Sequence, residues 1–317
     1  MSDLEVTQRV LGLLEPGAWR SGEAIASELG VSRVSVWKAV QKLKRGGYLL
    51  ESSVNGYRFE ADVPLGVEGV TYLGSVGSTM DEARGLARGG AAEFSAVLSE
   101  RQTAGRGRRG RAWQSPAGSG LYLSLVLRPN LPLSSLGLLP LLVGACLQRA
   151  IHAQTGWVGI LKWSNDLLTP DGRKLAGVLL ESEVEDGTAK FVVLGIGINL
   201  RVQEFPADLN AAALEEFVPH VDRRALLTSI LSELREQYQV FLESPQTALE
   251  LWRSHNGTLG QVVRVLTPDG SSWDGTAVDV ASDGGLQIRT LSGELKTVFA
   301  GDVSLRHTLN TASQENL

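Results

Sequence analysis

The sequence predicts a multidomain α+β protein built from three modules. Three short helical segments and a hairpin occupy the first 64 residues, strands and helices alternate up to about residue 256, and short strands alone follow. A chain of 317 residues is long enough for two or three domains of ordinary size. We therefore expect domains at residues 1–64, 65–256 and 257–317.

The composition is typical of a folded protein that lies outside membranes. Hydrophobic residues make up 43% and charged residues 21%, which excludes a disordered chain. The longest apolar run, residues 136–147, is shorter than the roughly 20 residues that cross a bilayer. Acidic residues near the N-terminus argue against a secretion signal, so we expect a cytoplasmic protein. The single cysteine, Cys146, excludes an internal disulfide framework and a cysteine-cluster zinc site.

Charge is distributed unevenly along the chain. Thirty basic against 35 acidic residues give a net charge of −5, which argues against a protein that coats nucleic acid over its whole surface. Two segments are nevertheless strongly basic. Residues 32–45 contain five cations and no acid, and residues 105–111 are four arginines and three glycines.

The N-terminal module has the element order of a winged helix-turn-helix. Helices are expected at residues 4–14, 22–29 and 33–45, with Ser32 capping the third and Gly46-Gly47 ending it. Residues 48–59 then read as a hairpin, for which Asn55-Gly56 supplies a type I′ turn.

The third helix of this module is the candidate DNA-reading element. Val36, Val40 and Leu43 fall on one face at helical spacing and are expected to face the core. A helix fits the major groove, where Lys and Arg meet phosphates and guanine edges and Gln can read adenine. The residues expected to contact DNA are Arg33, Lys38, Gln41, Lys42 and Arg45. The alternative is a small helical domain whose charged side chains only face water.

The rest of the chain is predicted to form a mixed α/β domain and a small β-barrel. In the central domain, strands are expected at residues 96–100, 121–127, 159–163, 175–181 and 191–198, and helices at residues 79–87, 134–154 and 222–242. The final strands are expected at residues 261–266, 272–279, 286–289 and 295–300, with turns at 268–270, 282–285 and 292–293.

The most informative central segment is the arginine loop, residues 105–111. Glycines let the backbone approach a ligand closely, and arginines offer planar donors to phosphate. The segment lacks the Gly-Lys-Ser/Thr of a P-loop and the spacing of a dinucleotide fingerprint. A bare Arg/Gly run is more often a flexible or RNA-binding segment. Because this one lies between two expected strands and Trp113 follows it, we predict a loop that orders over a nucleotide with an aromatic ring for the base.

Two strand ends carry further candidates. Lys162 lies in an apolar strand and must either reach the surface or meet an anion, because burying it unpaired is costly. Asn199 follows a glycine-containing apolar strand and could bond a purine edge or cap a turn.

A polar segment precedes the first helix of the central domain. Thr79 with Glu82 three residues later is a capping-box pattern, which explains both residues without a ligand. The hydroxyls of Ser78 and Thr79 could equally face a small polar ligand.

These segments, in this order after a winged helix, resemble the bifunctional biotin protein ligases that also act as biotin operon repressors. The resemblance covers essentially the whole chain. It rests on GSTMDEA at 77–83, RQTAGRGRRGRAWQSPAGSGLYLSL at 101–125, LKWSNDLL at 161–168, GRKLAGVLLE at 172–181 and VVLGIGINL at 192–200. It implies a class II synthetase-like catalytic domain and a C-terminal SH3-like β-barrel.

The resemblance also implies a two-step reaction. The biotin carboxylate attacks the α-phosphate of ATP, giving biotinyl-5′-AMP and pyrophosphate, and a lysine of a carboxylase carrier protein then takes the biotinyl group. Mg²⁺ is expected with ATP, and its protein ligands are unknown, with Asp166 as a candidate. No covalent enzyme intermediate is required, so a nucleophile–His pair is not expected.

The resemblance assigns roles to individual residues of this chain. The biotin pocket is expected to contain Ser78, Thr79, Gln102, Gly105, Arg106, Lys162 and Gly177, and more weakly Lys174. ATP and the adenylate are expected to meet Arg108, Arg111, Trp113, Lys162 and Asn199. Lys162, Arg106 and Arg108 are the expected catalytic residues, with Lys162 between the biotin carboxylate and the α-phosphate.

Two positions depart from the family pattern. Met80 stands where many relatives have asparagine, which puts the fine hydrogen bonding of the biotin pocket in doubt, and Ser164 stands where proline is usual. Two alternatives to a ligase stay open: a repressor that senses biotin without ligating it, and a lipoate or octanoate transferase. If the ligase reading holds, we expect a homodimer when the adenylate is bound, and an operator DNA as partner.

Overall fold

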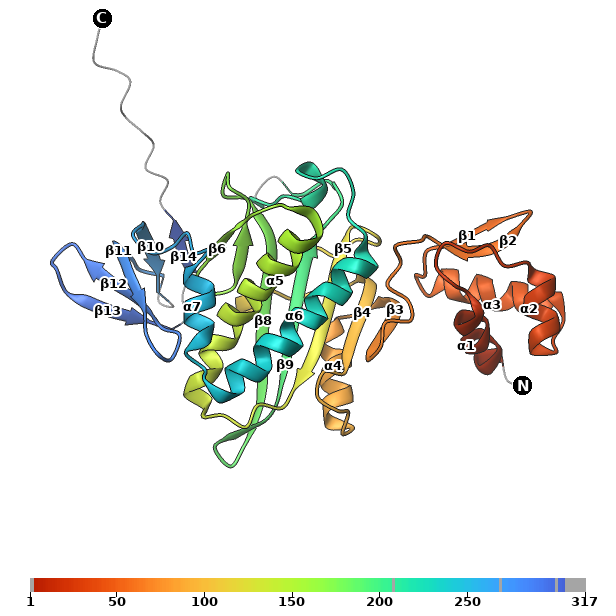
Figure 1. Cartoon of the computed structure of the whole chain (residues 1–317), viewed down its shortest axis with the longest axis horizontal. Helices are drawn as coiled ribbons and strands as arrows, with labels where there is room; N and C mark the ends of the chain where they lie inside the picture. Colours follow the sequence, from red (N-terminus) through yellow and green to blue (C-terminus); the bar gives the residue numbers. More distant parts are fainter. Residues whose placement is uncertain (1–2, 207–208, 268–269, 300–301, 306–317) are drawn as a thin grey trace, which may run out of the picture.

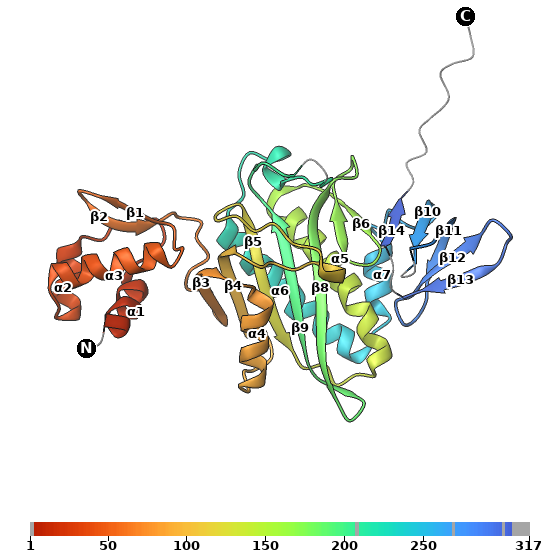
Figure 2. The ribbon, with the colours of Figure 1, turned by 180° about the vertical axis from the view of Figure 1, so that it is seen from behind.

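The three expected modules follow one another along the long axis of the molecule (Figure 1). The structure is a computed structural model, and it describes residues 3–206, 209–267, 270–299 and 302–305. The helical N-terminal module and the small C-terminal β-module lie at opposite ends of the central sheet, in Figure 1 and from behind in Figure 2.

The N-terminal module is a winged helix-turn-helix, as predicted. Its elements are α1 (Asp3–Leu13), α2 (Gly22–Leu29), α3 (Arg33–Arg45) and the hairpin of β1 (Leu50–Ser53) and β2 (Gly56–Phe59). The side chain of Ser32 accepts a hydrogen bond from the backbone N–H of Ser35 at 3.1 Å, so Ser32 caps α3 as expected. Val36, Val40 and Leu43 are buried.

The predicted type I′ turn of the hairpin is wrong by one residue. Ser53 pairs with Gly56, so Val54 and Asn55 form the turn. Among Val54, Asn55 and Gly56, only Gly56 has a positive φ, of 115°. A type I′ turn needs a positive φ at both of its central residues. Gly56 is required for another reason. A Cβ there would lie 2.1 Å from the carbonyl oxygen of Arg20.

The central module contains a seven-stranded sheet in the order β3-β4-β5-β9-β8-β7-β6. The strands are β3 (Val70–Val76), β4 (Ala96–Gln102), β5 (Gly120–Leu127), β6 (Ile160–Lys162), β7 (Asp166–Leu168), β8 (Lys174–Glu185) and β9 (Thr188–Asn199). Only β3 and β4 pair in parallel. The five expected strands are present, and β3 and β7 were not predicted.

Helices cover the two faces of this sheet unequally. On one face lie α5 (Leu139–Thr155), α6 (Arg223–Glu243) and α7 (Thr247–Arg253), and on the other lies α4 (Thr79–Arg88), as Figures 1 and 2 show. The helix expected at residues 134–154 begins as a 3₁₀ helix, Leu133–Leu138, because Pro140 can stand only in the first turn of α5. The combined segment Leu133–Thr155 is long and apolar enough to cross a membrane, but 72% of its most apolar stretch is buried inside the protein, as in a core helix.

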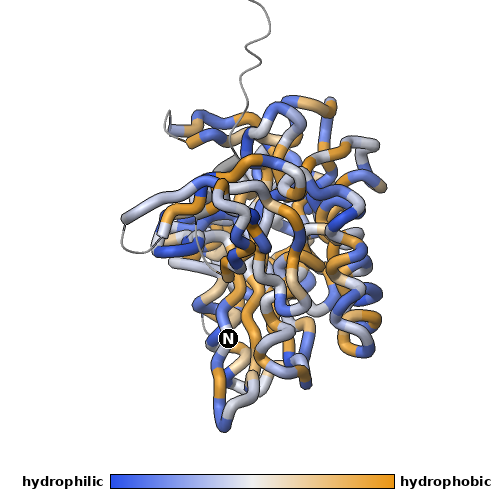
Figure 3. Tube along the Cα trace, turned by 90° about the vertical axis from the view of Figure 1, so that its left-hand side faces the viewer, coloured by the Kyte–Doolittle hydropathy of each residue, from blue (hydrophilic) through white to orange (hydrophobic). Residues whose placement is uncertain are grey.

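The C-terminal module is the predicted small all-β unit. Its antiparallel sheet has the order β13-β12-β11-β10-β14, formed by β10 (Val262–Leu266), β11 (Ser272–Val280), β12 (Leu286–Thr290), β13 (Leu295–Val298) and β14 (Asp302–Leu305). Figure 3 views the molecule from this end and shows short apolar and polar stretches alternating along the chain. The predicted turn at 268–270 lies partly outside the described residues, as does the end of the strand expected at 295–300.

A buried ionic cluster joins the N-terminal module to the central sheet. The guanidinium of Arg223, only 1% exposed, donates to Asp62 at 3.1 Å and to both carboxylate oxygens of Glu100 at 3.0 Å. Glu100 also accepts from the hydroxyl of Tyr72 and from the backbone N–H of Gly118. The cluster therefore fastens the segment after β2, strands β3 and β4 and helix α6 to one another.

Arg223→Met is expected to lower the free energy of unfolding by about 3–5 kcal/mol, because it leaves the buried Glu100 without its cation, whereas Asp62 keeps Arg201 at 2.8 Å. Urea unfolding followed by tryptophan fluorescence measures the loss. Arg224→Met is the matched control, since Arg224 is the exposed neighbour on the same helix. Equal stability of the two variants would contradict a structural role for the cluster.

Candidate active site

The floor of the candidate site follows from the side-chain alternation of β9. Alternate residues of a strand face the same side of the sheet. Phe191 and Val193 face α4 and bury against it, and Gly195, Gly197 and Asn199 continue the same row beyond that helix. A Cβ at Gly197 would lie 2.4 Å from the indole ring of Trp113, and one at Gly195 would lie 2.8 Å from the sulfur of Met80. Glycines thus leave room where larger residues would fill it.

A cavity of about 710 Å³ opens above these glycines. It collects all the residues expected to bind biotin or ATP except Gly105: Ser78, Thr79, Gln102, Arg106, Arg108, Arg111, Trp113, Lys162, Gly177 and Asn199. Gly105 lies beside the cavity, where the two arms of the loop come together and the N–H of Trp113 donates to the carbonyl of Gly105. A Cβ there would come within 2.6 Å of the carbonyl oxygen of Trp113.

Part of the cavity lining is neutral and polar. Gln102 accepts from the backbone N–H of Thr79 at 2.9 Å and from its hydroxyl at 3.1 Å, and the Thr79 hydroxyl lies 2.8 Å from that of Ser124. The amide of Gln102 donates to Ser115 at 2.9 Å. This network holds the start of α4 against β4, β5 and the loop.

The capping-box interpretation of Thr79 is wrong. Ser78 is the N-cap residue of α4, and its side chain makes no capping hydrogen bond. The hydroxyl of Thr79 instead bonds to the side chains of Gln102 and Ser124. The Ser78 hydroxyl is 2% exposed and has no hydrogen-bond partner among the described residues. Because buried polar atoms are almost always paired, this hydroxyl fits a polar ligand in the cavity.

The cavity lining also contains cations. Arg106 forms a bidentate pair with Asp81 of α4, with both N···O distances at 2.7 Å, and this pairing holds the pKa of the Asp81 carboxyl below its usual value. Arg84 bridges Asp81 to Glu181 of β8. The guanidinium of Arg106 is therefore engaged by carboxylates, a partner choice that the sequence did not indicate.

Arg108 takes a different kind of partner. It donates to the hydroxyl of Ser164 and, at 2.8 Å, to the side-chain oxygen of Asn165, in the turn between β6 and β7. Lys162 ends β6 and pairs in register with Asp166 of β7. The loop thus places Arg108 beside the strand that carries Lys162.

Trp113 lies over the glycine floor beneath a lysine. The ammonium of Lys174 is 5.3 Å from the centre of the indole ring and 2.6 Å from Asp166. The indole N–H of Trp113 is buried and has no partner among the described residues. Asp166, the candidate metal ligand, is therefore already paired with a cation.

The cavity is also lined by residues that the sequence analysis did not predict. Phe205, Pro206, Leu209, Asn210 and Ala211 come from an irregular segment with no periodic pattern, and Val303 comes from β14 of the C-terminal module. Hydrogen bonds between the backbones of Lys174 and residues 210 and 212 hold the irregular segment in place.

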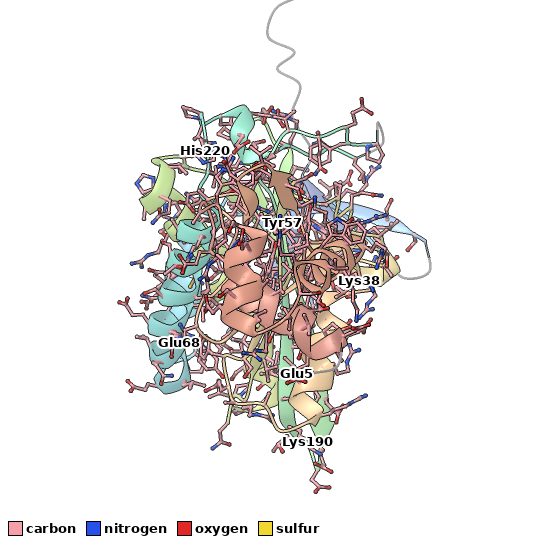
Figure 4. All side chains as sticks on the ribbon, turned by 90° about the vertical axis from the view of Figure 1, so that its right-hand side faces the viewer. Glu5, Lys38, Tyr57, Glu68, Lys190 and His220 are labelled. Atoms are coloured by element: carbon pink, nitrogen blue, oxygen red, sulfur yellow. The ribbon has the colours of Figure 1, made fainter. Side chains whose placement is uncertain are left out.

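The candidate DNA-binding residues lie apart from this cavity, on α3. Arg33, Lys38, Lys42 and Arg45 are exposed and Gln41 is half-buried. Lys38 lies on the outer side of the N-terminal module in Figure 4. The same helix exposes 60% of Val34 and 53% of Trp37, an apolar addition to the basic surface.

Comparison with known families identifies each module. Residues 86–199 match the biotin/lipoate A/B protein ligase family, residues 258–306 the biotin protein ligase C terminal domain, and residues 7–58 a helix-turn-helix domain. Fold and site together define a protein ligase of the biotin and lipoate class that carries an N-terminal DNA-binding fold.

Similarity to individual relatives identifies the family within this class. The chain is 32% identical over 306 residues to the bifunctional ligase/repressor BirA of Bacillus spizizenii, covering 90% of this chain and 93% of the relative. It is 30% identical to BirA of Escherichia coli, with 96% and 99% covered. The structure of an Aquifex aeolicus biotin protein ligase in complex with biotin and ATP superposes with a TM-score of 0.63 at 30% identity, covering 76% of this chain and 99% of that one. The chain belongs to the biotin protein ligase family, in its bifunctional ligase/repressor form.

Gly197→Ala is expected to raise the KM for ATP about tenfold or more, because the added methyl group overlaps the Trp113 ring and overpacking of this kind costs about 1–3 kcal/mol. Pyrophosphate release at varied ATP concentration measures the effect. Gly85→Ala in α4 is the control, since a Cβ there meets nothing within 4 Å. Indistinguishable KM values for the two variants would remove Trp113 from the nucleotide site.

Proposed function

We propose that this biotin protein ligase forms biotinyl-5′-AMP in the central cavity and transfers the biotinyl group to a lysine of a carboxylase carrier domain. The observation that carries the proposal is the make-up of the cavity lining, which combines neutral polar side chains, cations and glycines. A ureido ring suits the neutral polar side chains of Ser78, Thr79 and Gln102. A carboxylate that meets a triphosphate suits the cations.

The chemistry requires two displacements. A carboxylate oxygen of biotin attacks the α-phosphorus of ATP, and the bond to the β-phosphate oxygen breaks to release pyrophosphate. The carrier lysine nitrogen then attacks the acyl carbon, loses a proton and expels AMP. Lys162 neutralises charge that develops on the α-phosphate, a contribution of about 3–4 kcal/mol for one well-placed group. Arg108 acts as a further catalytic cation on the same phosphates, and Arg106 contributes its charge from the ion pair with Asp81.

Each side of the cavity lining is assigned to one of the two substrates. We assign the biotin side to Ser78, Thr79, Gln102, Gly105 and Gly177, together with Arg106 and Lys162, and the adenylate side to Arg108, Arg111, Trp113 and Asn199, again with Lys162. Trp113 is supported as the adenine platform by the glycines beneath it and by its unpartnered indole N–H.

Mg²⁺ enters this proposal with ATP. The described residues contain no group of three or more side chains suited to a metal ion, and Asp166 is paired with Lys174. Phosphate oxygens and water are the ligands that Mg²⁺ prefers when protein carboxylates are few. We therefore expect the metal to be held mainly by the triphosphate.

Intact-mass analysis of a carrier domain incubated with the protein, ATP, Mg²⁺ and biotin tests the ligase. One added biotinyl group is expected, and none when ATP is omitted. Lys162→Ala is expected to slow labelling by about 10²–10³ with biotin binding retained, because one electrostatic donor of this kind carries that much rate.

Lys190→Ala is the control for this variant, since Lys190 lies on β9, in the lower part of Figure 4, where it pairs with Glu185. No labelling by a wild-type protein that binds biotin would favour the sensing repressor. Labelling with lipoate instead of biotin would favour the transferase.

We further propose that the N-terminal module binds operator DNA through Arg33, Lys38, Gln41, Lys42 and Arg45. The exposure of four of these side chains on α3 and the repressor function named for the BirA relatives support this. We also propose domain limits at 1–64, 65–256 and 257–317, which is supported by each of the three sheets lying within one of these ranges. A cytoplasmic location fits a protein that acts on both a carboxylase and DNA.

Biotinyl-5′-AMP is expected to convert the protein to a homodimer that binds a palindromic operator more tightly, because one small basic helix per protomer gives weak binding alone. Sedimentation velocity with and without the adenylate measures the association. A protein that stays monomeric at micromolar concentration with the adenylate bound would contradict the dimer.

A further inference from the structure

The two anchored arginines of the loop are held by groups of different charge. Arg106 is bound by the carboxylate of Asp81, within an ionic network that includes Glu181. Arg108 donates to a hydroxyl and an amide oxygen, those of Ser164 and Asn165. Hydrogen bonds between a cation and a neutral acceptor are weaker than a bidentate ion pair, and both contacts of Arg108 come from one nitrogen, Nη1, so its five-donor guanidinium can meet a triphosphate without losing them.

The acceptors of Arg108 are themselves rigidly placed. The side chain of Asn165 donates to the carbonyl of Val178 at 2.8 Å, and the N–H of Val178 returns a bond to the carbonyl of Asn165 at 2.9 Å. On the other side, Trp163 is fixed to the C-terminal module by bonds to Thr258 at 2.8 Å and to Gly284 at 2.9 Å. Ser164 lies between these two fixed neighbours, two residues after Lys162.

We propose that Ser164 is a positioning residue that holds Arg108 beside Lys162 before ATP arrives. Its hydroxyl keeps the arginine loop closed over the cavity, so that nucleotide binding does not have to order the loop from an open state. The catalytic part of the proposal rests on the ligase function proposed above.

Ser164→Ala and Ser164→Pro test the proposal in the full-length protein. Each is expected to raise the KM for ATP about tenfold, the size of one hydrogen bond to a charged group, with kcat and the Kd for biotin unchanged. Ser164→Thr, which keeps a hydroxyl, is expected to restore the wild-type KM. Ser182→Ala, an exposed serine of β8, is the control.

A double-mutant cycle shows whether Ser164 acts through Arg108. In an Arg108→Ala background, Ser164→Ala is expected to change the KM for ATP by less than twofold, because the partner is already gone. A further tenfold rise would show that the serine acts on something else and would overturn the proposal.

Trypsin gives a readout that needs no catalysis. Without substrates, cleavage at the arginines of residues 105–111 is expected to be faster in Ser164→Ala and Ser164→Pro than in wild type, since the loop opens more often. Wild-type cleavage rates in both variants would overturn the proposal. If the wild-type protein fails to label a carrier while the cleavage rates rise as expected, the ligase function fails and the loop contact stands.

Discussion

The buried guanidinium of Arg223 is the interaction on which the arrangement of the modules depends. A charge with 1% exposure is tolerated only when it is paired, and here Asp62 and Glu100 pair with it from two distant segments. Glu100 precedes Gln102 by two residues on β4, and it also binds the backbone of Gly118, where the arginine loop returns to β5. The same charges therefore fix the segment that leads from the winged helix and both ends of the loop that closes the active site.

A second constraint, the two-residue period of β9, decides where the cavity lies. If every residue in the row that begins with Phe191 and Val193 were large and apolar, the row would pack against α4 along the whole length of the helix. Its change to Gly195 and Gly197 stops the packing and leaves space for an indole ring and a ligand. The opposite row, Val192, Leu194, Ile196 and Ile198, stays apolar throughout and packs into the main core. One strand thus supplies core on one face and a binding floor on the other.

The sequence predicted the parts that local patterns encode and missed those set by distant partners. Long apolar strands, the capped third helix and the arginine loop have strong local signals. The strand β3 and the short β7 have weak ones, because three to seven half-buried residues form a strand only when a neighbour pairs with them. The same reason explains Thr79, which looks like a capping residue in its own segment but binds Gln102 across 23 positions of the chain. The choice of Asp81 by Arg106 and of Ser164 by Arg108 spans 25 and 56 positions and leaves no local trace.

The unequal anchors of the arginine loop connect these constraints to the two tasks of the protein. A loop closed only by carboxylates would hold its cations away from phosphate, and a loop closed only by neutral groups would open freely and release the reactive adenylate to water. Here Arg106 keeps one side of the loop on α4 and β8, while Arg108 rests through one nitrogen, Nη1, on two neutral acceptors. A guanidinium has five N–H donors, so a phosphate can bind Arg108 with both of these contacts in place. The loop is tied, through Gly118 and Glu100, to the ionic cluster that holds the DNA-binding module.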